Sequence, residues 1–515
     1  MRGGFSIRRR IFLLPAAIAL AAVLLSGCAP AAPEANPHPE QPETERQAGA
    51  SSGPQLRTLH TQRGLVTVST EALDGGSDRH AVQLRRYKLF NGDDVVMGRC
   101  TAADSLGSTQ TFSFPLDAGG GTLRWYDAAA AQWNTEPLQD GVIRAGCVIL
   151  TADSGGEYLI YTPKVYELLE RSTVRHLPEL DGRIRIRTSG DSREAVLEVP
   201  GLPAGCAADF TVVRSRDALF DWSDEAGFQA AWPEHDTLDG TGKLCFDGYY
   251  YQSPSTYIPS GEHCYYRLPA AYLCKHYILN ADGIRAAEDL AIASMDTMAQ
   301  LQNPLGYFPT EPESEWLSGD YGIGPGFYDT RFNTELAENF YRIAQSNRCR
   351  EFDAVMERYF DFYLSYASAH HTETASGGWL VEDYYHPGGG SKTHTALNHQ
   401  LAEILTLYHH AEYLERPELA ELGDRMLLAI QDTAAEWIRE DGNLHYAVYA
   451  DGTYGGTDYP YLTYNDLFLL NQYLCSAGRS VPELQRLMEA KLGWMQRQGI
   501  TGYLQDGASL SAGSA

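Results

Sequence analysis

The chain has 515 residues, and the roughly 460 that follow residue 55 suffice for two or three domains with their own cores. Its formal net charge of −27 argues against nucleic-acid binding, because neutralising phosphates requires a basic face. The nine cysteines include no Cys-x-x-Cys spacing, which argues against zinc ribbons and thioredoxin-like chemistry.

Residues 1–28 are typical of a lipoprotein signal. Arg8, Arg9 and Arg10 precede an apolar run at residues 11–25, and the small residues after it lead directly to Cys28. A basic start, an apolar run too short to span a membrane comfortably and a small-residue cleavage site form a secretory signal. We predict cleavage before Cys28 and lipid on its thiol, so that the chain is exported and membrane-anchored, facing the extracytoplasmic side. An ordinary signal peptide or an uncleaved anchor is the alternative.

Residues 29–55 predict a disordered tether, because Pro, Ala, Glu and Gln dominate and almost nothing can be buried. A coil of this length extends on the order of 30 Å from its anchor. The folded part would therefore stand clear of the lipid headgroups.

Residues 56–163 favour strands and turns. Residues 64–69 and 111–116 alternate between apolar and polar side chains, and a glycine turn precedes residues 122–126. An antiparallel, sandwich-like packing is expected. A second β-rich region covers residues 164–240, and its independence as a domain stays open.

From residue 241 to residue 515 the apolar spacing becomes helical. Helices are predicted at 268–279, 284–301, 332–344, 352–366, 394–413, 419–438, 464–474 and 482–495. Eight successive helices suggest about four antiparallel pairs closing into an α/α toroid, whose inner helices line a concave cavity. A helical solenoid is the alternative, although no fixed repeat period is present.

The most informative segment is residues 377–399, a glycine-rich aromatic loop that leads into a predicted helix. Ser391 or Thr393 would cap this helix, and Lys392 would lie beside its N-terminus. Exposed amides and a lysine at one place suit an anionic group such as a carboxylate.

On that helix, His394 and Asn398 are expected to share one face, and His399 and Glu403 an adjacent one. The alternative is a capped helix whose histidines are simply packed and hydrogen-bonded. A metal site from His399 and Glu403 is also weighed, but no third ligand is evident.

Two further loops carry candidate residues. Tyrosines, among them Tyr459 and Tyr464, gather at residues 451–466, where rings can stack on sugars and phenols can bond hydroxyls. The same service is expected of Trp379, Trp316 and Tyr307. Such aromatics can instead plug the ends of a toroid. At residues 324–335, Arg331 could hold a carboxylate, or could pair with a neighbouring acidic residue as scaffolding.

Residues 249–474 resemble the C-terminal domain of the D-glucuronyl C5-epimerases, most closely at residues 392–399 and 458–460. The resemblance implies an α/α barrel that acts on glucuronate within polysaccharide chains and uses tyrosines. Tyr459 and Tyr464 match the tyrosine-bearing loop. It also implies an anionic polysaccharide as partner, which a local basic pocket could bind despite the net negative charge, because distant charge is screened within about 10 Å.

The implied chemistry is proton abstraction from the carbon beside a carboxylate, with no metal and no cofactor. A phenol is a poor base unless nearby cations lower its pKa. The predicted catalytic residues are Tyr459, Tyr464, Tyr384 and His394. The predicted substrate-binding residues are Arg331, Lys392, Asn398, Trp379, Tyr328 and His399.

Three other functions stay open: a uronate lyase, a glycoside hydrolase and a non-catalytic glycan-binding lipoprotein. A hydrolase needs two carboxylates about 5 to 10 Å apart. Glu382, Asp383, Glu335 and Asp466 could supply them. Aromatic loops alone would satisfy glycan binding.

Overall fold

The computed structural model describes residues 54–74, 80–117, 119–143, 145–190, 192–223, 232, 235 and 238–505. The predicted signal, Cys28 and nearly all of the tether lie outside these residues. Within the described ranges, no helix is both long and apolar enough to cross a membrane. The eight cysteines in this part of the chain are free thiols.

The largest β-sheet has fourteen antiparallel strands. In the order in which neighbours pair, they are β1 (Gln55–Thr61), β2 (Gly64–Asp74), β3 (His80–Lys88), β4 (Asp94–Ala102), β15 (Cys206–Ser215), β11 (Lys164–Leu168), β12 (Thr173–His176), β19 (Cys264–Arg267), β17 (Gly248–Gln252) and β16 (Gly242–Cys245). A branch leaves β15 through β10 (Glu157–Tyr161), β9 (Cys147–Ala152), β6 (Gly121–Asp127) and β7 (Gln132–Pro137).

A four-stranded sheet packs against this branch. It consists of β5 (Gln110–Leu116), β14 (Ser192–Val199), β13 (Arg183–Ser189) and β8 (Gly141–Ile143), and the short helix η1 (Pro178–Leu180) precedes β13. Ile184 and Ile186 alternate inward from β13 and pack with Ile160 and Val212 of the larger sheet. Both β-rich segments of the sequence therefore contribute strands to both sheets, with β4 paired to β15 and β5 paired to β14.

The opposite face of the larger sheet packs on helices. Val66, Val95 and Val213 from the sheet share one core with Leu273 and Leu290 from two helices. The polar contacts across this layer include the Tyr87 hydroxyl, which donates to the buried Asp296 carboxylate over 2.8 Å. Within residues 242–267, which precede α2, the strands β16, β17 and β19 belong to this sheet.

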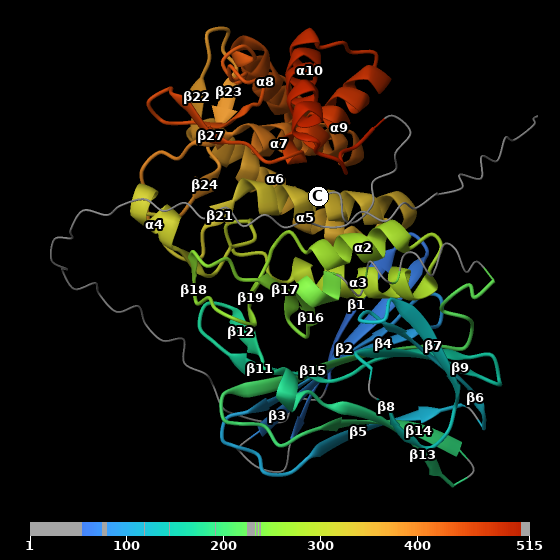
Figure 1. Ribbon diagram of the computed structural model, residues 1–515. Helices are drawn as coiled ribbons and strands as arrows, with labels where there is room; N and C mark the ends of the chain where they lie inside the picture. The colour runs from blue at the N-terminus through green and yellow to red at the C-terminus, as the bar shows by residue number, and fades with distance from the viewer. Residues whose placement is uncertain are drawn as a thin grey trace, which may run out of the picture.

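Each of the eight predicted helices is present, with its ends shifted by a few residues. The helices are α2 (Tyr272–Asn280), α3 (Arg285–Ala299), α4 (Glu315–Tyr321), α5 (Thr330–Asn347), α6 (Arg350–Ala369), α7 (Leu397–Tyr413), α8 (Pro417–Thr433), α9 (Leu462–Ser476) and α10 (Pro482–Gln498). The short α4 was not expected from the sequence, and neither was the helical conformation of residues 238–241. Figure 1 shows the helices above the sheets, with α2 and α3 between the strands and the later helices.

The helices form pairs with an inner and an outer member. α5 contacts α2 and α7, and α7 contacts α9, while α3, α6, α8 and α10 follow them as the second members. α5 and α7 are buried on most sides and carry many buried polar residues, whereas α6 and α8 bury one apolar stripe. The inner helices α2, α5, α7 and α9 line a common cavity, as expected for a toroid of helix pairs. Closure of the helices into a complete toroid stays a prediction.

Candidate active site

Short strands hold the loops at the N-terminal ends of the inner helices. They are β18 (Tyr257–Ile258) with β20 (Glu313–Ser314), β21 (Tyr328–Asp329) with β24 (Tyr384–Tyr385), β22 (His371–Glu373) with β23 (Trp379–Val381), and β25 (Thr395–Ala396) with β26 (His445–Val448) and β27 (Tyr454–Thr457). These pairings bring segments near residues 257, 329, 384, 394 and 446 together, although they lie far apart in the sequence.

Two aspartates cap the helices that begin there. The Asp329 carboxylate accepts a 3.0 Å hydrogen bond from the amide of Phe332, in the first turn of α5. Both Asp383 oxygens accept from the amide of Ala396, the residue before α7, at 3.0 Å. The partial positive charge of a helix N-terminus favours a carboxylate at this position.

An aromatic cluster surrounds these aspartates. Its central ring is His394, with ring centroids 5.5 to 6.1 Å from those of five neighbours: Trp316, Tyr321, Tyr384, Tyr446 and Tyr449. Tyr459 joins the cluster through Tyr446, at 5.9 Å.

The cluster is open to solvent along one side. His394 is 1% exposed, whereas Trp316, Tyr449 and Tyr459 are 39%, 39% and 46% exposed. Exposed rings around a buried polar centre suit the faces and hydroxyls of a saccharide.

The carboxylates set the protonation of the site. Burial raises the pKa of Asp329 to about 7, and the nearby charge of Asp383 adds to this effect. Burial also raises the pKa of the Tyr384, Tyr446 and Tyr459 phenols, and the negative charge of Asp329 raises all three further. At neutral pH these phenols are therefore proton donors, and Asp329 is the group whose pKa matches neutral acid–base work.

Asp383 lies beside the two histidines, although His394 Nε2 has no hydrogen-bond partner among the described residues. The Oδ2 atom of Asp383 lies 3.3 Å from His394 Nε2 and 3.5 Å from His399 Nδ1. The Tyr321 hydroxyl lies 2.9 Å from His394 Nδ1, the other ring nitrogen of that residue. Thr330 Oγ1 lies 2.9 Å from His399 Nδ1. Burial lowers the pKa of His399 to about 4, so its ring is neutral at physiological pH. His394 and His399 thus have fixed ring orientations beside the cluster.

Arg331 lies behind the cluster and is fully engaged. Its guanidinium donates to both oxygens of Asp466 at 2.8 and 3.2 Å, to Glu335 at 2.8 Å and to the Asn398 carbonyl at 2.9 Å. Arg331 therefore pairs with a neighbouring acidic residue, Glu335, as in the second of the two roles considered from the sequence. Asp466 is an additional partner that the sequence did not indicate.

The structure brings together Tyr384, His394, His399 and Tyr459, with Arg331 and the Asn398 backbone beneath them. Four other predicted residues lie elsewhere. Tyr464 packs on Phe468 and Tyr503, Trp379 stacks on His371, Tyr328 bonds Tyr359 in the core, and Lys392 donates to the His371 carbonyl.

The expected start of the helix after the glycine-rich loop is wrong. α7 begins at Leu397, because Thr395 and Ala396 pair with β26 and because Asp383 binds the Ala396 amide. His394 therefore precedes the helix and does not share a helical face with Asn398. Neither Ser391 nor Thr393 acts as the cap, and Lys392 lies in the loop, away from the helix N-terminus.

The alternative metal site gains no further ligand. Glu403 accepts a 2.5 Å hydrogen bond from the Tyr363 hydroxyl, and burial raises its pKa to about 8. Among the described residues, no three His, Cys, Asp or Glu side chains are grouped so as to hold a metal ion.

Trp316, expected from the sequence to stack on sugars, does belong to the cluster, whereas Tyr321, Tyr446 and Tyr449 were not selected from the sequence. For Tyr321 a local signal exists, because Ser314 caps α4 by accepting from Leu317 and Gly322 ends it in a left-handed conformation. Tyr446 and Tyr449 join the cluster through the pairing of β25 with β26, for which no local signal exists.

No protein-family model matches this chain, and neither does any curated protein. Solved structures with some similarity include D-mannose isomerase, at 10% identity over 45% of this chain and 61% of that chain, with a TM-score of 0.33. Cellobiose 2-epimerase from Spirochaeta thermophila is 12% identical over 52% of this chain and 65% of that chain, with a TM-score of 0.35. A family 76 glycoside hydrolase from a bovine Bacteroides thetaiotaomicron strain is 9% identical over 78% of this chain and 75% of that chain, with a TM-score of 0.36. At these TM-scores, the similarities assign neither a fold family nor an activity.

Proposed function

We propose that this chain is a carbohydrate-active enzyme of the epimerase type, which moves a proton on a sugar carbon next to a carboxylate. The observation that supports this most is the position of Asp329, whose pKa is near neutrality, among phenols that keep their protons. The substrate class is uronate-containing polysaccharide, with C5 epimerisation of glucuronate residues as the reaction.

The proposed roles differ from those expected from the sequence. Asp329 takes the proton from the sugar carbon, and the electron pair moves into the adjacent carboxylate. A phenol of Tyr459 or Tyr384 returns a proton to the opposite face. The remaining phenols donate hydrogen bonds to the oxygens on which negative charge develops. They take the stabilising role expected of Arg331 from the sequence, because Asp466 and Glu335 already neutralise Arg331.

A hydrolase is less well supported by the same contacts. Glycoside hydrolysis needs two carboxylates that reach the substrate. Asp383 is 1% exposed, and both of its oxygens accept from Ala396, while Asp466 and Glu335 hold Arg331. Asp329 is also buried and accepts the Phe332 amide, but burial raises its pKa to about 7, which suits a group that takes and returns a proton near neutral pH.

The proposal includes the cellular location. Export and lipid attachment at Cys28 would place the cluster in contact with polysaccharide outside the cytoplasm, and the basic-then-apolar segment before Cys28 supports this. Replacing Cys28 with Ser should release the protein from membranes, and unchanged membrane retention would contradict this part.

The test is incubation of the mature protein with glucuronate-containing polymers in heavy water, with a neutral glucan as the comparison. We expect deuterium at C5 of the uronate and none in the glucan. Tyr459→Phe removes only a hydroxyl and should lower the exchange rate about 10²–10⁴-fold if Tyr459 is the acid.

The matched control is Tyr473→Phe, a tyrosine on α9 that stacks on Tyr408, away from the cluster. Its exchange rate should equal that of the parent. Release of sugar without deuterium at C5 would replace the epimerase by a hydrolase, new unsaturation would indicate a lyase, and binding without reaction would indicate a glycan-binding protein.

A further inference from the structure

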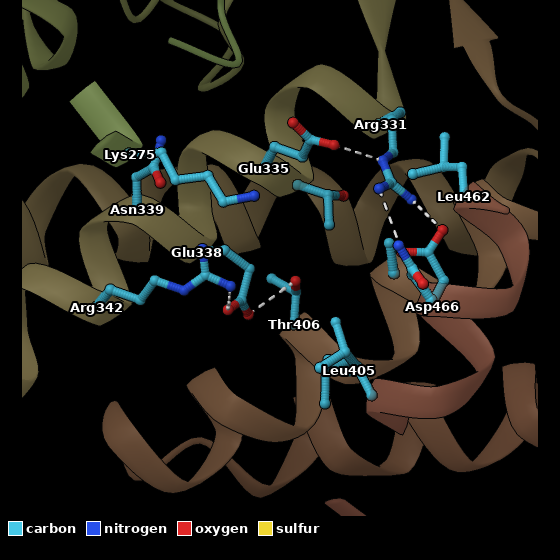
Figure 2. A pocket seen from close by; sticks show the side chains of 14 residues that line it. Lys275, Arg331, Glu335, Glu338, Asn339, Arg342, Leu405, Thr406, Leu462 and Asp466 are labelled. Carbon is cyan, nitrogen blue, oxygen red and sulfur yellow. Dashed lines mark hydrogen bonds and ion pairs between the residues drawn. The ribbon is translucent and has the colours of Figure 1, made fainter. Parts of the chain in front are cut away.

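The polar cavity between the inner helices is lined by Arg331 but by none of the rings of the aromatic cluster. It has a volume of about 70 Å³ and is lined by residues of α2, α5, α7 and α9. Figure 2 shows the Lys275 side chain extending across it toward the space between Glu335 and Glu338, with Arg342 on the same side. The charged side chains of the lining are Lys275, Arg331, Arg342, Glu335, Glu338 and Asp466.

Part of this charge is already neutralised within the protein. Arg331 is paired with Asp466 and Glu335, and Glu338 accepts from Thr406 at 3.0 Å and lies 2.8 Å from His409 Nδ1. These contacts form the framework of the cavity and leave Arg331 and Glu338 no need of a ligand.

Two cations remain without a close partner. Lys275 is 8% exposed, and its ammonium makes no hydrogen bond or ion pair with any described residue. Arg342 comes no closer than 3.9 Å to its nearest carboxylate, Glu338. Burial, together with the positive charge of Arg342 and Arg331, lowers the pKa of Lys275 to about 8. An anion between Lys275 and Arg342 would relieve this repulsion.

Two acceptors also lack donors. Glu335 Oε2 and Asn339 Oδ1 are buried and have no hydrogen-bond partner among the described residues. A buried acceptor without a donor is destabilising, so a ligand that supplies donors is favoured at these atoms.

We propose that this cavity binds a small carboxylate that carries hydroxyl or ammonium groups. Lys275 and Arg342 hold the carboxylate, and Glu335 and Asn339 accept from the donor groups. The site is separate from the aromatic cluster and does not rest on the epimerase proposal. A cavity of about 70 Å³ limits the ligand to a small acid, for which glycerate and serine are suitable probes.

The test is calorimetric titration of the full-length protein with glycerate, serine and glycerol. Glycerol is the matched probe, because it keeps the hydroxyls and lacks the carboxylate. We expect glycerate or serine to bind at least about tenfold more tightly than glycerol, since only the acids offer a carboxylate to the charged donors Lys275 and Arg342. Binding of glycerate alone assigns hydroxyl donors, and binding of serine alone assigns an ammonium.

Lys275→Met, of similar length and without charge, should weaken binding at least tenfold. Arg342→Gln provides a second, more exposed position, so that a folding defect at Lys275 does not decide the outcome. Lys88→Met, on an exposed site of β3, should bind like the parent. The proposal would be overturned by equal affinity for glycerate and glycerol, or by no binding of either acid. It would also be overturned if Arg342→Gln and any folded Lys275→Met protein kept the parental affinity. The cavity would then hold only water.

Discussion

Arg331 allows a stringent test of the view that this arginine supports the site and does not bind substrate. Arg331→Met would leave Asp466, Glu335 and the Asn398 carbonyl without their shared donor; Asp466 and Asn398 are buried, and Glu335 is half-buried. Removing one partner of a buried ion pair costs about 3–5 kcal/mol, and we expect a loss of that size in the free energy of unfolding.

The loss should depend on pH with a defined sign. Burial raises the pKa of Asp466, and Arg331 opposes this effect. Without Arg331 the pKa rises further, so the folded variant holds a proton that the unfolded chain releases above about pH 4. A group whose folded pKa is raised contributes stability at low pH, and this contribution is lost as pH rises through the folded pKa. The destabilisation should therefore be smaller at pH 5 than at pH 8.

The assay is urea unfolding followed by circular dichroism at both pH values. The double variant Arg331→Met/Asp466→Leu is the control, because replacing both partners of a buried pair by apolar residues is often neutral. It should recover about half of the loss or more. A loss below about 1 kcal/mol in the single variant, or one independent of pH, would refute the reasoning.

Three further predictions follow from individual contacts. Lys491 is fully buried and donates to Asp458 and to the Tyr459 carbonyl, both at 2.6 Å. Lys491→Met should therefore lower the free energy of unfolding by about 3–5 kcal/mol and, by freeing the Tyr459 loop, lower the activity. Thermal unfolding measures the first effect, and deuterium exchange at C5 measures the second. Because the pKa of Glu403 is raised to about 8, its stabilising contribution falls as pH rises from about 4 to 8, and Glu403→Gln should flatten that part of the unfolding profile. Trp316→Ala removes an exposed ring that contacts Tyr384 and His394. Initial rates should show KM raised by about tenfold and kcat little changed. A lower kcat with an unchanged KM would instead place Trp316 in the chemical step.

The helices were predictable because each long helix buries an apolar face, and burial leaves a period in the sequence. The start of α7 was not, because a side chain distant from the helix, Asp383, takes the Ala396 amide and Thr395 joins a strand. Lys392 was predicted beside a helix N-terminus because the helix was expected to begin at His394. Since α7 begins at Leu397, Lys392 lies in the loop.

The sheet order was beyond local reasoning. β5 pairs with β14 and β4 with β15, and no periodicity within either strand specifies a partner so far along the chain. The alternation that marked the strands predicts burial on one face, which is satisfied by many pairings.

The site was predictable in part. The glycine-rich and tyrosine-rich loops were singled out by composition, and Tyr384, His394 and Tyr459 do lie near one another in the structure. The role of Asp329 could not be predicted, because its pKa depends on burial and on Asp383, which only the fold brings near.

The most direct test of the account is the pH dependence of deuterium exchange at C5 in the parent and in Asp329→Asn. If Asp329 is the base, the parental rate rises with pH through an apparent pKa near 7, because the carboxylate must be ionised to accept the proton. In the variant the rate should fall about 10²–10⁴-fold and this rise should disappear. An Asn variant that exchanges at the parental rate with the same pH profile would contradict the account.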